Sequence, residues 1–210
     1  MKTRILGLAA TLSVALTATS LAAPITTPPP ALNASGDVTA FYVFANASDT
    51  SVLNMTAPPP GMDKIFCNHS TTGCTAAAAG DMVPLGTLSA PLVFTLDNVS
   101  TGTTFQSNAS DSDGNYHVLI TDNLADFGLG LSLPASLQDF INNNPGVDVT
   151  FVGWEDLTLG QGSDFDYNDL IFAFTNTAAG TPTPTPEPAT LALLGTGLVA
   201  FGAFHLRKKS

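Results

Sequence analysis

Basic residues are scarce in this chain of 210 residues, which has 6 Lys and Arg against 17 Asp and Glu. Five of the six lie near the ends and only Lys64 lies between them, the others being Lys2, Arg4, Arg207, Lys208 and Lys209. Without a cationic surface to contact phosphates, the chain is not expected to bind nucleic acid or an anionic membrane surface. Its length fits one acidic domain plus targeting segments.

Motifs of known catalytic sites are also missing. The sequence has no nucleophile elbow, no His-Glu-x-x-His and no phosphate-binding loop. Its three histidines are far apart: His69, His117 and His205. Paired carboxylates serve glycosidases, but acids gathered in one acidic loop are expected to lack the apolar surroundings that raise a pKa. The sequence therefore predicts that the protein is not an enzyme.

The first 22 residues are typical of a secretory signal peptide. Lys2 and Arg4 precede the apolar run 5–16, and Ser20-Leu21-Ala22 places small residues where a signal peptidase reads them. We predict cleavage after Ala22, because cutting one residue later would place Pro24 next to the scissile bond. The alternative is that this segment stays uncleaved as a membrane anchor, but the apolar run is short for a helix that spans a bilayer.

A second apolar segment, residues 189–206, carries no charge and is followed by the basic residues of 207–210. Its 18 residues would span about 27 Å as a helix, close to the roughly 30 Å of a bilayer core. Positive residues stay in the cytoplasm. We therefore predict an inner-membrane helix, a basic cytoplasmic tail and an acidic body outside. Residues 178–188, rich in Thr-Pro, predict a stiff linker.

Pro186-Glu187-Pro188, the apolar segment and the basic tail together resemble the PEP-CTERM sorting signal of Gram-negative bacteria. In that family an exosortase recognises the three-part tail, cuts near the Pro-Glu-Pro, and releases the protein to the cell surface or exopolysaccharide matrix. The resemblance implies export, with signal peptidase and exosortase as processing partners and surface polysaccharide as a further candidate partner. A plain tail anchor is the alternative.

Cys67 and Cys74 are the only cysteines, with six residues between them. In an exported chain such a pair predicts a disulfide. The alternative is a zinc site that includes His69, but two Cys and one His lack a fourth ligand.

Residues 36–177 predict an all-β domain, an antiparallel β-sandwich with one short helix. Short runs rich in β-branched and aromatic residues alternate with Gly, Pro, Asn and Asp, which is typical of this architecture. We expect a helix over 134–142. The expected strands are 38–45, 82–88, 92–96, 103–107, 116–121, 147–154 and a last strand in which Leu170, Phe172 and Phe174 share one face, opposite Ile171 and Ala173. Residues 57–63 predict a loop, and the Pro-rich residues 23–35 an extended leader.

Acidic side chains gather between the last two predicted strands. Within fifteen residues there are five carboxylates and one Asn, with no basic residue among them: Glu155, Asp156, Asp164, Asp166, Asn168 and Asp169. Crowded like charges repel, and a hard cation held by oxygen ligands would offset that repulsion. We predict a Ca²⁺ site. Solvated turn residues without an ion are the alternative.

The sequence does not decide whether residues 164–169 are an extended strand or a loop. An extended chain would project Asp164, Asp166 and Asn168 to one side and Asp169 to the other, whereas a loop would let all four converge. An EF-hand is excluded, since Asp169 and Thr175 stand where that loop requires Gly and Glu.

The same stretch resembles the domain of unknown function 4114 of secreted bacterial proteins, through Trp154-Glu155-Asp156 and the run Ser163–Asp169. The resemblance covers residues 98–176 and implies a β domain, suggests calcium and implies no enzyme activity. A weaker second ion site is predicted at Asp111, Asp113 and Asn115, with a hairpin turn as the alternative.

The sequence is compatible with three functions. The first is a calcium-stabilised structural or interaction protein of the surface or matrix. The second is a calcium-dependent carbohydrate-binding or adhesin module, which exposed Trp154 and Tyr167 beside the ion would favour. The third, least favoured, is a carbohydrate-active enzyme.

Overall fold

The computed structural model describes residues 23–60, 62, 64–89 and 91–180. The predicted signal peptide with its cleavage site at Ala22, the Pro186-Glu187-Pro188 motif and the predicted membrane helix 189–206 lie outside the described residues. Among the residues that are described, no helix has the length and apolar character needed to cross a membrane.

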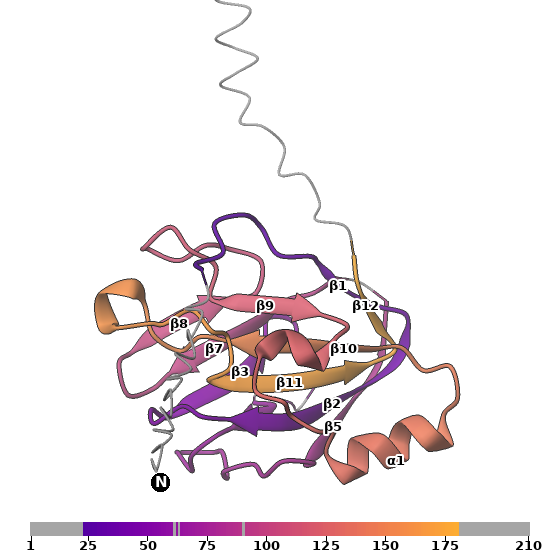
Figure 1. The fold of residues 1–210 in the computed structure, drawn as a ribbon. Coiled ribbons are helices and arrows are strands. Elements are labelled where there is room, and N and C mark those ends of the chain that lie inside the picture. The colour runs from indigo at the N-terminus through magenta and orange to yellow at the C-terminus, as the bar shows by residue number, and fades with distance from the viewer. Residues whose placement is uncertain (1–22, 61, 63, 90, 181–210) are drawn as a thin grey trace, which may run out of the picture.

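The domain is built from antiparallel sheets, as predicted (Figure 1). The largest has the order β5-β2-β11-β10-β9, formed by Met82–Leu88, Gly36–Ala45, Leu170–Thr175, Val149–Trp154 and Val118–Thr121. A four-stranded sheet has the order β4-β3-β7-β8, formed by Phe66–Cys67, Ser51–Met55, Phe94–Asn98 and Thr103–Gln106. A small sheet has the order β12-β1-β6, formed by Thr177–Ala179, Leu32–Ala34 and Pro91–Leu92.

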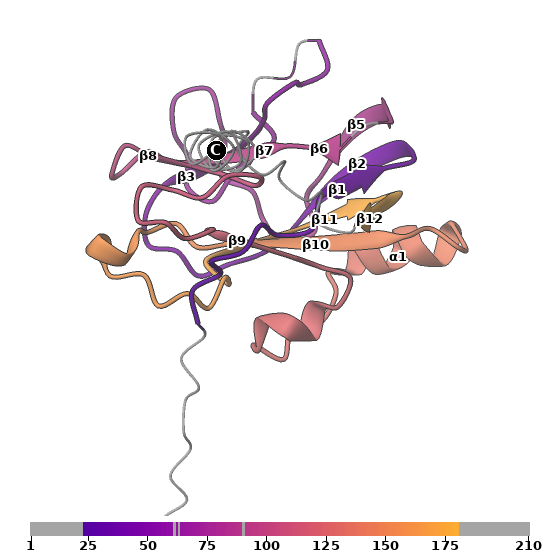
Figure 2. The same cartoon turned by 90° about the horizontal axis from the view of Figure 1, so that it is seen from above.

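The five-stranded sheet separates two apolar layers. On one side it packs against the four-stranded sheet, and on the other it is covered by α1 (Ala135–Asn143) and the 3₁₀ turn η1 (Leu124–Phe127). Figure 2 shows η1 on the opposite side of β10 from β3, β7 and β8. The predicted β-sandwich with one short helix is confirmed, with β-strands predominating and α1 the single α-helix among the residues described.

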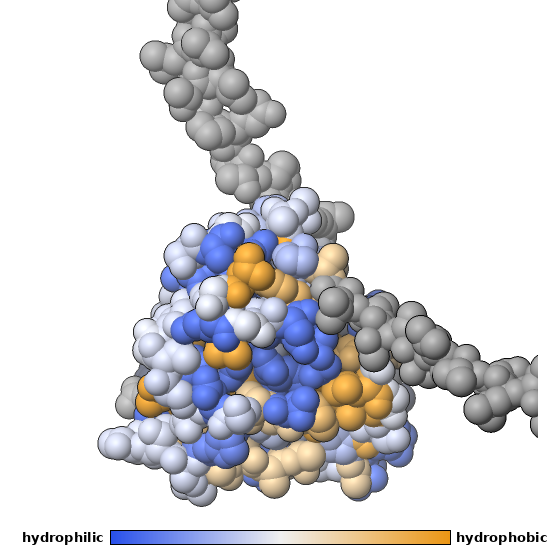
Figure 3. All heavy atoms as spheres, turned by 60° about the vertical axis from the view of Figure 1, so that its left-hand side comes forward, coloured by the Kyte–Doolittle hydropathy of each residue, from blue (hydrophilic) through white to orange (hydrophobic). Residues whose placement is uncertain are grey.

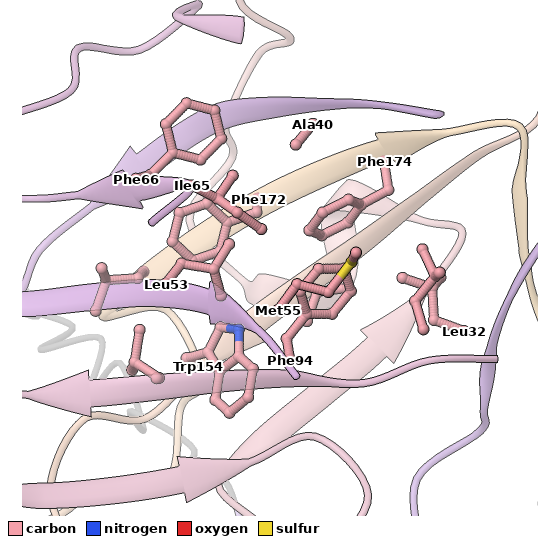
Figure 4. Close-up of a cluster of buried hydrophobic side chains, with 14 of the residues drawn as sticks. Leu32, Ala40, Leu53, Met55, Ile65, Phe66, Phe94, Trp154, Phe172 and Phe174 are labelled. Carbon is pink, nitrogen blue, oxygen red and sulfur yellow. The ribbon is translucent and has the colours of Figure 1, made fainter. Parts of the chain in front are cut away.

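Aromatic side chains fill the space between the two main sheets (Figure 4). Phe172 stacks on Phe66 with ring centroids 5.8 Å apart, and Phe174 stacks on Phe94 at 4.5 Å. Leu170 is buried in the same cluster, whereas Ile171 and Ala173 face the helical layer. The alternation predicted for the last strand is therefore confirmed.

Some strand predictions were wrong. The predicted strand 92–96 is two strands, because Leu92 pairs with Leu32 in the small sheet while Phe94 pairs with Met55 in the four-stranded sheet. The chain thus changes sheets at Val93. Strands β1 and β12 extend the ordered β structure into the regions assigned to the leader and the linker, and Leu32 is 1% exposed. Strand β3 was not predicted, since its short run lacks a clear alternation.

The predicted disulfide is present between Cys67 and Cys74. His69 instead lies with Nε2 3.4 Å from the carbonyl oxygen of Ala47, so the zinc alternative is not supported. Cys67 is buried in β4, which pairs with β3.

Replacing both cysteines by Ser is expected to lower the free energy of unfolding by about 2.5 kcal/mol, because the open loop regains entropy in the unfolded chain. Denaturant unfolding under oxidising conditions measures this loss. A reducing agent should destabilise the wild-type chain and leave the Cys67→Ser/Cys74→Ser variant unaffected. Equal midpoints for the two chains would contradict the expectation.

Candidate metal centre

The acidic residues are brought together by the pairing of β10 with β11. Trp154, the last residue of β10, lies opposite Leu170, the first residue of β11. Glu155 follows the one strand and Asp169 precedes the other, so the two ends of the acidic stretch meet at one edge of the sheet. The connection between them, with the turn η2 (Leu159–Gln161), projects from the left of the domain in Figure 1.

Residues 164–169 form a loop rather than an extended strand. Phe165 and Tyr167 have left-handed φ angles of 55° and 56°, which bulky residues rarely adopt. Both aromatic side chains are 3% exposed and pack in the helical-side core with Ile171. The aromatic residues thus anchor the loop at every second position, and the extended alternative is wrong for this stretch.

Three of the predicted ligands converge. Glu155, Asp164 and Asp166 each offer a carboxylate oxygen, and these oxygens lie within 4.8 Å of one another. Glu155 is buried, Asp166 is half-buried and Asp164 is exposed. This arrangement could hold a metal ion, reached from solvent on the Asp164 side.

Two buried oxygens of the acidic stretch have no hydrogen-bond partner within the described part of the chain: Oε2 of Glu155, which belongs to the triad, and Oδ1 of Asn168. The two residues are 2% and 4% exposed. A buried acceptor without a donor destabilises the fold by about 1–3 kcal/mol. Carboxylate and amide oxygens are ligands that Ca²⁺ takes, so the donor set fits a hard divalent cation.

Asp156 and Asp169 lie beside the triad and are engaged with the protein. The carboxylate of Asp156 accepts a hydrogen bond from the Ser51 hydroxyl at 3.0 Å, and that of Asp169 accepts one from the Asp156 N–H at 3.0 Å. Asn98 donates to the Asp156 carbonyl at 2.8 Å. Ser51 and Asn98 come from the facing sheet, and sequence reasoning missed both because no local pattern links them to the acidic stretch.

Burial changes the acid–base properties of these groups. Burial first, and then the charge of Asp169, raises the pKa of Glu155 to about 8 and that of Asp156 to about 7. Burial also raises the pKa of Asp166. The expectation that these acids lack surroundings that raise a pKa was therefore wrong.

The second predicted ion site is a turn closed by the hydrogen bond from Asp111 N–H to the Asn115 carbonyl, at 2.9 Å. The Asp113 carboxylate accepts hydrogen bonds from the backbone N–H groups of Leu159 and Asn115, each at 3.0 Å, and lies 3.1 Å from His117 Nε2. Burial opposes ionisation, but these hydrogen bonds lower the pKa of Asp113 overall. Asp113 thus ties the turn to η2. The buried Oδ2 of Asp111 has no hydrogen-bond partner among the described residues, so the second ion site and the hairpin turn both stay predictions.

Gly153 in β10 allows the acidic loop to pack directly against this strand. A Cβ atom at this position would collide with the Phe127 ring and with the backbone carbonyl oxygen of Tyr167. The loop can therefore lie directly against β10 only because position 153 has no side chain. The sequence offered no signal for this role beyond a Gly within a predicted strand.

Fold and site together define a β-sandwich domain with an acidic, oxygen-rich site at one edge of its main sheet. The surface on the η2 side is largely hydrophilic, with separate apolar spots (Figure 3).

Residues 184–209 match the PEP-CTERM protein-sorting motif, which implies an exported protein that exosortase sorts at the membrane. The comparisons with curated proteins and with solved structures gave no match. The motif match does not extend into the β domain, so the resemblance to the domain of unknown function 4114 stays a prediction.

Proposed function

We propose that this chain is an exosortase-sorted protein of the cell surface or extracellular matrix, and that its β domain binds Ca²⁺ and has a structural or interaction role. The observation that carries the calcium site is the convergence of three carboxylates, one of which belongs to the buried Glu155, whose Oε2 has no hydrogen-bond partner among the described residues. The matching sorting motif supports the destination. On this proposal the domain is not an enzyme.

The alternative functions gain no comparable support. Exposed Trp154 and Tyr167 beside the ion would have favoured the carbohydrate-binding alternative, but the two residues are 0% and 3% exposed. Two cavities, of about 190 and 230 Å³, are lined by other residues, among them Leu92 and Val93. A glycosidase would need its two carboxylates on opposite sides of a bound sugar.

Calcium is expected to raise the melting temperature of the exported chain, residues 23–210 in detergent, over that in excess chelator. At millimolar calcium a typical extracellular site stabilises a fold by about 1–2 kcal/mol, which corresponds to a shift of several degrees. The variant Asp164→Asn/Asp166→Asn should lose this shift, because it removes two charged ligands.

The matched control is Asp122→Asn/Asp139→Asn, which removes the same charge from two exposed positions outside the triad. This variant should keep the full response to calcium. A wild-type melting temperature that is the same in calcium and in chelator would rule out the calcium site and leave the sorting signal as the functional assignment.

A further inference from the structure

The first residues after the predicted cleavage site pack against the acidic loop. Ile25 lies three positions after Ala22 and is half-buried against the core cluster that contains Phe165 and Tyr167. Its N–H donates to the Tyr167 hydroxyl at 2.7 Å, and its carbonyl accepts from the Tyr116 N–H at 2.8 Å. A short N-terminal segment is thus fixed to a loop that lies 142 positions further along the chain.

The Tyr167 hydroxyl connects three segments of the chain. Besides accepting from Ile25, it donates to the carbonyl oxygen of Tyr116 at 3.3 Å. Tyr167 stands between Asp166 and Asn168, two members of the candidate site, so the position of its backbone sets theirs.

The backbone at Tyr167 needs such an anchor. Its φ of 56° is unfavourable for a bulky residue, and such conformations persist where the surrounding structure fixes them. Burial of the ring and the two hydrogen bonds of the hydroxyl supply that constraint from outside the loop.

We propose that Tyr167 and Ile25 are positioning residues, which hold the cation's ligands in place. This inference rests on the calcium site proposed above. The N-terminal segment holds the Tyr167 ring, and the ring holds the neighbouring Asp166 where its carboxylate converges with that of Glu155. The cation site therefore depends on the segment around Ile25, and the acidic stretch alone is not the whole binding unit.

Calcium titration of the exported chain by isothermal calorimetry tests this role. Tyr167→Phe keeps the ring but removes both hydrogen bonds. It should weaken calcium binding by at least about 3- to 10-fold, because each lost hydrogen bond corresponds to a change of about that size. Ile25→Ala keeps the N–H and should weaken binding less than Tyr167→Phe does. Tyr42→Phe, which removes the hydroxyl of another buried tyrosine on the opposite side of the sheet, should bind like the wild type.

The melting temperature in chelator separates positioning from general stability. A Tyr167→Phe variant that melts earlier in chelator and yet binds calcium as tightly as the wild type would overturn the proposal, because the hydroxyl would then be a structural contact only. If the wild type itself binds no calcium, the proposed calcium site is wrong and this inference is wrong with it. That outcome is seen in the wild-type titration, before any variant is compared.

Discussion

The Gly153→Ala variant is expected to lose its native fold, or at least about 4 kcal/mol of stability, which places it among the most damaging single substitutions. The added methyl group would enter fully packed space between the Phe127 ring and the Tyr167 carbonyl oxygen. An aromatic ring can shift, but a backbone carbonyl moves only if the whole acidic loop moves. Overpacked cores with mobile neighbours lose less, typically about 1–3 kcal/mol.

The reason for this effect is contact and not backbone conformation. Gly153 does not have a left-handed φ, and it pairs regularly with Ile171 and Leu119 in the middle of the main sheet. Circular dichroism and thermal melts of the exported chain measure the loss. Gly160→Ala is the matched control, since a Cβ there has ordinary contact distances and an unstrained φ. A cooperative Gly153→Ala melt at the wild-type temperature would contradict the packing seen here.

Sequence reasoning succeeded where the information was local. The alternation of Leu170, Phe172 and Phe174 against Ile171 and Ala173 gave the two faces of β11, because side chains alternate with period two in any strand. The clustering of carboxylates pointed to the candidate site, because their mutual repulsion is visible in the letters themselves.

Sequence reasoning failed where distant segments decide the structure. Ser51 and Asn98 brace Asp156 from the opposite sheet, and Ile25 reaches Tyr167 from the other end of the domain. The role of Gly153 depends on a carbonyl that a different loop brings against it. None of these contacts leaves a periodic or spaced pattern. The composition of the acidic stretch therefore showed which carboxylates lie together but not which distant residues hold them in place.

Without metal, the protein is expected to become less stable as the pH rises from 5 to 9, the reverse of the usual behaviour of paired carboxylates. Burial, followed by the Asp169 charge, raises the folded-state pKa of Glu155 from 4.5 to about 8 and that of Asp156 from 3.8 to about 7. Between these limits the folded chain holds protons that the unfolded chain has released, so the free energy of unfolding falls with increasing pH. The protonated carboxyl groups stabilise the fold fully at a pH below their unfolded-state pKa values. This stabilisation is lost once the pH rises above their folded-state pKa values.

From pH 5 upward about three pKa units remain for Glu155 and about two for Asp156. At about 1.4 kcal/mol per unit the upper bound on the loss is about 7 kcal/mol, and we expect less than this because the two carboxyl groups share the neighbour Asp169, so their effects overlap. Urea unfolding in chelator at pH 5, 7 and 9 measures this loss. Saturating calcium should flatten the profile, because the cation then provides the counter-charge that the protons provide at low pH. Glu155→Gln/Asp156→Asn should flatten it without any ion. A wild-type profile that rises from pH 5 to 9 in chelator would show that neither carboxyl group is protonated in the folded domain, which would remove the electrostatic reason for a cation at this site.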